Sequence, residues 1–108
     1  MAASTPQDLF LFVRSAPVTL LYFTGPDCGV CHSLWPRIEA MLAEEFPHIP
    51  WRKVDAQEER AFAAQSGVFA IPTVLCYFDG KEGLRLVRSF GLQQLRDALE
   101  RPYRLLFS

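Results

Sequence analysis

The run Val18–Thr24 constrains the fold of this chain more than any other segment. Its sequence, Val-Thr-Leu-Leu-Tyr-Phe-Thr, is almost uninterruptedly apolar and rich in residues that favour β-strands. A pattern without alternation is typical of a central strand that is covered on both faces. The rest of the chain therefore has to supply packing elements for two sides of a sheet.

A long amphipathic helix is predicted directly after this strand, from Gly29 to about Phe46. Gly25-Pro26 breaks the chain between strand and helix. The apolar stripe of the helix recurs at i+4 spacing and consists of Val30, Leu34, Ile38, Leu42 and Phe46, with Met41 widening it. Pro36 falls inside the helix and is expected to kink it about one turn in.

The other elements follow from the same periodicities and from turn residues. In chain order they are a helix from Pro6 (after Ser4-Thr5) to near Ala16-Pro17, a strand Ile49–Asp55, a short helix capped by Asp55 and closed by Gly67, a strand Thr73–Phe78, a turn at Asp79-Gly80, a returning strand Leu84–Phe90, and a helix Leu92–Arg101 stopped by Pro102.

This order predicts an α/β fold with a mixed four-stranded sheet. The first β-α-β unit crosses over right-handed and makes its two strands parallel, whereas the last two strands form an antiparallel hairpin. Helices are expected on both faces of the sheet. With 108 residues, half of them hydrophobic, the chain is expected to form one domain, residues 1–108.

Charge and targeting signals narrow the range of partners. The formal net charge of −1 argues against a nucleic-acid partner. The N-terminus lacks a basic leader, and no apolar run approaches the roughly 20 residues that span a bilayer, so no membrane partner is expected. We therefore expect a cytoplasmic protein, whose cysteines stay reduced unless they do redox work.

Cys28 and Cys31 form a Cys-Gly-Val-Cys motif, and Cys76 stands alone. An odd count of three argues against a disulfide-stapled scaffold. Cys28 lies in the turn at the start of the predicted helix, where unpaired amides and the helix dipole favour a thiolate. Cys31 lies one helical turn farther and can reach the sulfur of Cys28. We therefore predict a pair in which Cys28 attacks a partner disulfide and Cys31 resolves the mixed disulfide.

The strand, the Cys-x-x-Cys motif, Pro36 five residues later and Ala70-Ile71-Pro72-Thr73 together resemble the thioredoxin family over roughly residues 6–101. The resemblance implies a thioredoxin-like fold in which Pro72 is cis and faces the cysteine pair across a groove. Ile71, Pro72 and Thr73 then form the substrate rim, and the backbone of Ile71 bonds a substrate strand. We expect Trp35 to be partly exposed and to line the same groove.

Several residues depart from the family pattern, which more often reads Trp-Cys-Gly-Pro-Cys-Lys. Asp27 replaces the tryptophan, and its charge opposes the thiolate of Cys28, whereas a protonated His32 supports it. Gly29 and Val30, the latter in place of proline, complete the set expected to tune the pair.

Two further differences from thioredoxins concern the surroundings of the pair. Tyr22 aligns with the buried aspartate that thioredoxins use as a proton acceptor, so Cys31 is expected to lose its proton to water or another group. Only 17 residues precede Val18, so we expect the leading strand of the family to be missing before the first helix.

The predicted function is reduction of protein or peptide disulfides by a monomer. Its electrons come from a separate reductase or a small thiol, and no metal or organic cofactor is implied. A binding or chaperone-like adaptor that uses the same groove, and a protein oxidase or isomerase, remain open as alternatives.

Two other types of cysteine site fit parts of the sequence. Cys28-Gly-Val-Cys31-His32 formally fits the haem-attachment pattern, but the strong strands argue against it. A zinc site would need Cys28, Cys31 and His32 with His48 or Cys76 as fourth ligand. We expect instead that Cys76 is a buried inert thiol and His48 a loop residue.

Overall fold

The computed structural model describes residues 6–107. Its elements come in the predicted order: α1 (Pro6–Phe12), β1 (Val18–Thr24), α2 (Gly29–Glu45), β2 (Trp51–Asp55), α3 (Arg60–Gln65), β3 (Thr73–Phe78), β4 (Lys81–Val87) and α4 (Leu92–Phe107). The strands form one sheet in the order β2-β1-β3-β4. β1 and β2 are parallel, and the other two pairings are antiparallel. The predicted mixed four-stranded sheet is confirmed.

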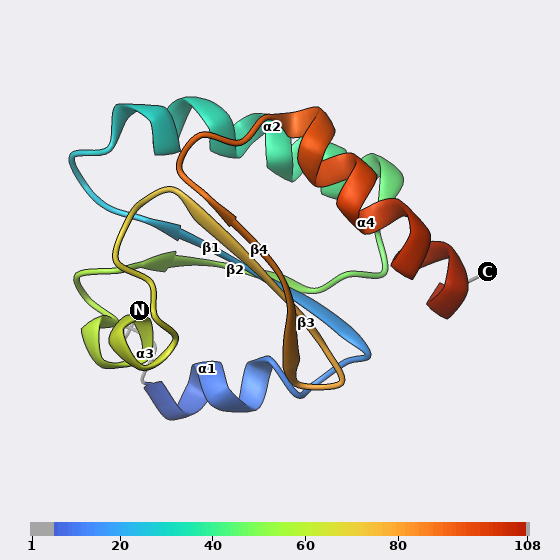
Figure 1. Ribbon diagram of the computed structural model, residues 1–108, viewed down its shortest axis with the longest axis horizontal. Coiled ribbons are helices and arrows are strands. Elements are labelled where there is room, and N and C mark those ends of the chain that lie inside the picture. Colours follow the sequence, from blue (N-terminus) through green and yellow to red (C-terminus); the bar gives the residue numbers. More distant parts are fainter. Residues whose placement is uncertain (1–5, 108) are drawn as a thin grey trace.

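Helices cover both faces of the sheet, with α2 and α4 on one side and α1 and α3 on the other (Figure 1). All seven residues of β1 are buried, as the apolar run predicts. Leu20 and Tyr22 pack in the core under α2 and α4. Leu21 and Phe23 pack in the second core, under α1 and α3. β1 thus contributes side chains to both cores. This packing fixes the position of the C-terminal end of β1 and of the segment that follows it.

The last helix corrects one prediction, because α4 does not stop at Pro102 but continues to Phe107. The ring of Tyr103 contacts Phe46 with centroids 5.1 Å apart, and its hydroxyl accepts a hydrogen bond from the backbone N–H of His48 at 3.2 Å. The ring of Phe107 in turn packs against His48. This packing compensates for the backbone hydrogen bond that a proline removes inside a helix.

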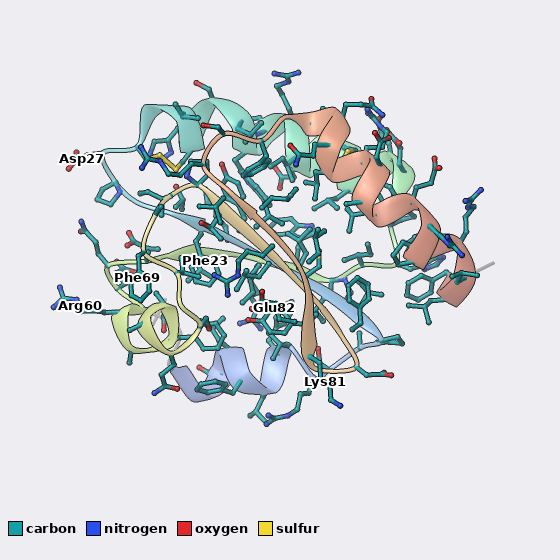
Figure 2. The ribbon with its side chains drawn as sticks, viewed as in Figure 1. Phe23, Asp27, Arg60, Phe69, Lys81 and Glu82 are labelled. Carbon is teal, nitrogen blue, oxygen red and sulfur yellow. A yellow bond between two sulfur atoms is a disulfide. The ribbon has the colours of Figure 1, made fainter. Side chains whose placement is uncertain are left out.

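The turn at Asp79-Gly80 is confirmed, and both residues have positive φ, 54° and 80°. Two-residue hairpin turns need this left-handed backbone, which asparagine, aspartate and glycine tolerate best. The returning strand begins directly after the turn, at Lys81 (Figure 2), and ends at Val87. The predicted range of Leu84–Phe90 was therefore about three residues too late.

Two other boundaries differ from the predictions. α1 ends at Phe12, before Ala16-Pro17, and its expected cap at Ser4-Thr5 lies outside the described residues. β2 begins at Trp51 rather than Ile49.

Asp55 caps a turn that precedes α3 rather than α3 itself. Its Oδ1 accepts hydrogen bonds from the backbone N–H groups of Gln57 and Glu58 at 2.8 and 3.2 Å, and α3 begins only at Arg60. Gly67 ends this helix with φ 70°, as predicted.

Candidate functional site

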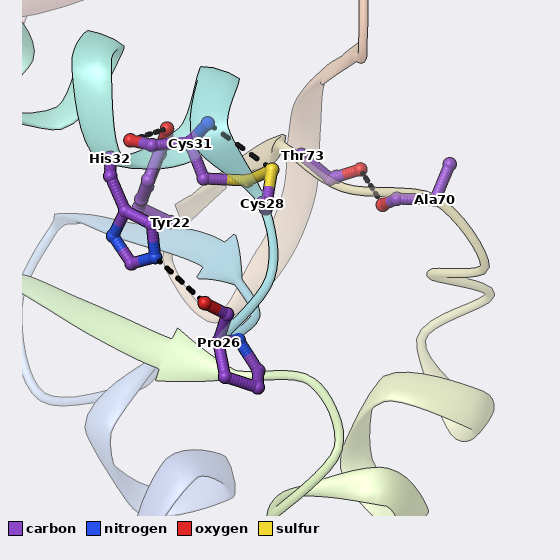
Figure 3. Close-up of a disulfide and its surroundings, with 7 residues drawn as sticks. All are labelled: Tyr22, Pro26, Cys28, Cys31, His32, Ala70 and Thr73. Carbon is purple, nitrogen blue, oxygen red and sulfur yellow. Dashed lines mark hydrogen bonds between the residues drawn. A yellow bond between two sulfur atoms is a disulfide. The ribbon is translucent and has the colours of Figure 1, made fainter.

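The cysteine pair lies where β1 leads into α2. Cys28 is the N-cap residue of α2 and forms a disulfide with Cys31, with 5.2 Å between the two Cα atoms (Figure 3). The backbone N–H of Cys31 donates a hydrogen bond to the Sγ of Cys28 at 3.2 Å. The sulfur of Cys28 therefore occupies the position in which helix amides favour a negative charge.

The two cysteines differ in accessibility. Cys31 is 0 % exposed and lies in the core under α2 and α4, whereas Cys28 is only partly buried. A partner can reach the sulfur of Cys28 from outside, and the sulfur of Cys31 only through Cys28. This geometry matches the predicted order of attack and resolution.

A groove of about 410 Å³ opens beside Cys28. The Ile71–Pro72 peptide bond is cis, as the resemblance implies, and both residues line the groove opposite Gly29 and Val30. Thr73 does not line it. Its side chain is buried and donates a hydrogen bond to the carbonyl of Ala70 at 2.7 Å (Figure 3).

Trp35 corrects another expectation, because it is 7 % exposed and does not line the groove. Its ring packs against Tyr22 and Trp51, each with centroids 4.8 Å apart. Trp51 is the first residue of β2. The indole of Trp35 therefore supports the core beneath the cysteines.

Tyr22 lies under the first turn of α2. Its hydroxyl donates a hydrogen bond to the backbone carbonyl of Cys31 at 2.9 Å. Burial raises the pKa of Tyr22 to about 12. A phenol that stays protonated at neutral pH cannot accept the proton of Cys31, so Tyr22 holds the helix turn in place instead.

Asp27 and His32 are both exposed beside the pair. Asp27 points outward at the tip of its loop (Figure 2). The ring of His32 turns toward Pro26, with Nε2 3.4 Å from the carbonyl oxygen (Figure 3). Neither side chain is bonded to a cysteine sulfur, and their tuning role stays a prediction.

Sequence reasoning missed Arg88, Ser89 and Phe90, which line the groove across from Cys28. The backbone N–H of Arg88 donates to the carbonyl of Pro72 at 2.7 Å. The hairpin offered a signal: a strand that returns from the turn at Asp79-Gly80 and pairs with β3 must bring the following residues next to Pro72.

The structure does not bring together the ligands that a zinc site would need. Cys28 and Cys31 are bonded to each other, and Cys76 is 0 % exposed within β3, where burial raises the pKa of its thiol. His48 stacks on Tyr103 in the loop before β2. Because β2 is parallel to β1, this loop lies at the other end of the strands from the cysteine pair. Within residues 6–107 no three His, Cys, Asp or Glu side chains gather closely enough to hold a metal ion.

No helix within residues 6–107 is long and apolar enough to cross a membrane.

Comparison with known proteins gives consistent matches. A family model described as Thioredoxin matches residues 3–101. A thioredoxin of Chlamydia trachomatis is 36% identical over 92% of this chain and 92% of its own length. A thioredoxin-like protein of Bacillus subtilis, YdfQ, is 33% identical over 87% of this chain and 83% of its own. The crystal structure of a Fasciola hepatica thioredoxin superposes with a TM-score of 0.81 at 31% identity, covering 90% of this chain and 93% of the other.

Proposed function

The chain belongs to the thioredoxin family, and from this premise we propose that it is a thiol–disulfide oxidoreductase that reduces disulfides in proteins or peptides. The observation that carries the proposal is the Cys28–Cys31 disulfide, which caps α2 beside the cis Pro72. The pair has one accessible and one buried sulfur, which suits two successive thiol–disulfide exchanges.

The reaction starts from the dithiol form of the pair. The thiolate of Cys28 attacks one sulfur of the substrate disulfide, which forms a mixed disulfide and releases the other sulfur as a thiolate. The sulfur of Cys31 then attacks the Sγ of Cys28, which releases the second substrate thiolate and forms the Cys28–Cys31 disulfide. Two electrons pass to the substrate. A separate reductase or a small thiol returns them to the pair, and no metal or organic cofactor takes part.

The proton of Cys31 needs an acceptor in the second step. The hydroxyl of Tyr22 donates to the Cys31 carbonyl, and its pKa of about 12 makes it a donor rather than a base. We propose that the thiolate released from the substrate, or water in the groove, takes this proton. The first step releases the substrate thiolate on the accessible side of the pair, next to the mixed disulfide that Cys31 attacks.

A second part of the proposal concerns the molecule's setting. We propose that residues 1–108 act as a single domain and a monomer in the cytoplasm, where a reducing environment suits a reductase. An equilibrium redox titration of the cysteine pair against glutathione distinguishes the proposed reductase from the alternative, a protein oxidase. A reductase should have a potential near the value of about −270 mV that is typical of thioredoxin, whereas an oxidase lies much higher.

Steady-state turnover tests the proposed function. A peptide with one disulfide and a fluorescent reporter is reduced by catalytic amounts of protein with dithiothreitol as donor. Cys28→Ser should abolish the catalysed rate, and Cys76→Ala, a change at the buried cysteine outside the site, should keep it. If wild type and Cys28→Ser accelerate the reaction equally, the enzymatic function is wrong, and the adaptor alternative gains.

A further inference from the structure

Two arginines flank the groove beside Cys28. Arg88 lines the groove that contains Cys28 itself. Arg37 lines a neighbouring groove of about 530 Å³ along α2. The two grooves share Gly29, Val30 and Phe90, so they form one continuous surface.

The backbone fixes Arg88 at this place. Its φ is 60°, a left-handed value that is uncommon for a residue with a side chain. The N–H of Arg88 bonds the carbonyl of Pro72, and the N–H of Ser89 bonds the carbonyl of Val87 at 2.8 Å, which closes a tight three-residue turn. Strained backbone at a non-glycine residue is often found at binding sites. The side chain of Arg88 therefore starts from a defined point on the rim.

Neither groove arginine has an ion-pair partner among residues 6–107. Other arginines of the chain do: Arg85 is 2.7 Å from Glu82, and Arg96 is 2.9 Å from Glu45. No carboxylate lines either groove, because the remaining lining residues are uncharged: Cys28, Gly29, Val30, Ser33, Leu34, Ile71, Pro72, Ser89 and Phe90. The lining therefore combines apolar contacts with two arginines and no carboxylate, and the exposed Asp27 beside the pair lines neither groove.

We propose that the protein prefers disulfides whose cysteine lies in an apolar segment with acidic residues, and that Arg88 and Arg37 select them. This inference rests on the proposed function and names its substrate class. Arg88 binds a carboxylate next to the attacked cysteine, because it shares a groove with Cys28. Arg37 lies nine residues after Cys28, which corresponds to about 14 Å along the axis of α2 at 1.5 Å per residue. It therefore binds a carboxylate about four residues from the attacked cysteine, if the substrate chain is extended.

Peptide reduction measures this preference. A set of peptides shares one apolar sequence and one disulfide, and carries Glu, Gln or Lys next to the cysteine and four residues away. Wild type should reduce the Glu peptide with a kcat/KM roughly tenfold above that of the Lys peptide, since two exposed ion pairs are replaced by two repulsions. The ratio should fall at high salt, which screens exposed charges.

Variants assign the preference to the two arginines. Arg88→Gln and Arg37→Gln should each lower the Glu-to-Lys ratio about threefold. Arg60→Gln should leave it unchanged, because Arg60 is an exposed arginine at the start of α3 that lines neither groove. Arg88→Gly removes the same charge while it relaxes the φ of 60°, so it should match Arg88→Gln. If Arg88→Gly and Arg88→Gln keep the wild-type ratio, Arg88 does not select the substrate.

Binding separates failure of this inference from failure of the proposed function. The Cys28→Ser/Cys31→Ser protein cannot react, and its affinity for the same reduced peptides is measured by fluorescence anisotropy. Tighter binding of the Glu peptide supports the inference whether or not wild type turns over. Equal binding and equal kcat/KM for the Glu and Lys peptides overturn it, although the reductase activity would stand.

Discussion

At the residue scale, local sequence was enough to predict where the cysteine pair lies, at the start of the helix that follows the buried strand. Cys28 and Cys31 could be placed because a strand, a break and a helix follow one another within a few residues. The exposure of Trp35, in α2, could not be predicted, since it depends on packing against Trp51 in β2. Arg88 was missed for the same reason: its place beside Pro72 depends on the register of the hairpin and not on its neighbours.

The contact between Tyr22 and Cys31 gives a prediction at this scale. Tyr22→Phe removes one buried hydrogen bond and should lower the free energy of unfolding by about 1 kcal/mol. The pH dependence of the reduction rate between pH 6 and 9 should not change, because a phenol with a pKa of about 12 does not titrate there. Chemical denaturation and a pH–rate profile measure the two effects. A shifted profile in the variant would mean that Tyr22 handles the proton after all.

Glu59 gives a second prediction, on stability. Glu59 is 5 % exposed, and within residues 6–107 its Oε1 has no hydrogen-bond partner. Burial, then the charges of Glu58 and Asp8, raise its pKa. A raised pKa means that the folded state binds the proton more tightly than the unfolded state. The cost of ionisation therefore grows as pH rises above the ordinary value of 4.5 toward the raised value, and stays in full above it.

Removing this charge should stabilise the protein at neutral pH. Glu59→Gln should melt at a higher temperature than wild type at pH 7, and the difference should shrink below about pH 4.5, where both side chains are neutral. Melting curves at pH 4 and pH 7 measure it. Glu44→Gln serves as the control, because Glu44 is exposed on α2, which covers the other face of the sheet from α3 (Figure 1). A wild type that is more stable than Glu59→Gln at pH 7 would contradict the unfavourable burial.

At the element scale, the helices and strands could be predicted but several of their ends could not. The helix stop at Pro102 failed because packing of Tyr103 and Phe107, made with residues from distant segments, continues α4 beyond the proline. The start of β4 was placed too late because Gly83 falls in a register shift that breaks the alternation of the strand.

Gly83 provides the prediction at this scale. In the register of the hairpin, Tyr77 pairs with Glu82 and Cys76 with Leu84, so Gly83 is the extra residue. A Cβ at this position would overlap the ring of Phe78. Gly83→Ala should therefore cost about 1–3 kcal/mol of unfolding free energy.

A matched glycine controls for the substitution itself. Gly29 lies in α2, and no neighbouring side chain comes within 4 Å of the position that a Cβ would take there. Gly29→Ala should therefore stabilise the protein by about 0.5–1 kcal/mol. Urea denaturation of both variants gives the comparison. A Gly83→Ala protein as stable as wild type would show that the Phe78 ring moves aside freely.

At the scale of the whole molecule, the groove is assembled from three segments that are far apart in sequence. Residues 28–30 follow β1, residues 71–72 precede β3, and residues 88–90 follow β4. β1 and β3 are adjacent and antiparallel, and β3 and β4 are antiparallel as well. The C-terminal ends of β1 and β4 and the N-terminal end of β3 therefore lie side by side at one end of the sheet. The cysteine pair and the proline could be assigned to the groove by resemblance. The positive charge of the groove could not be predicted, because residues 88–90, which include Arg88, were assigned to the strand Leu84–Phe90.

The central claim is that Cys28 attacks and Cys31 resolves, and trapping tests it most directly. Reduced Cys31→Ser protein is mixed with a disulfide peptide, and intact mass and peptide mapping are recorded without reductant. We predict one covalent peptide per chain, bonded to Cys28 and released by dithiothreitol, whereas reduced wild type should accumulate none and end with the Cys28–Cys31 disulfide. Folded Cys31→Ser protein that forms no adduct, or an adduct at Cys76, would contradict the claim.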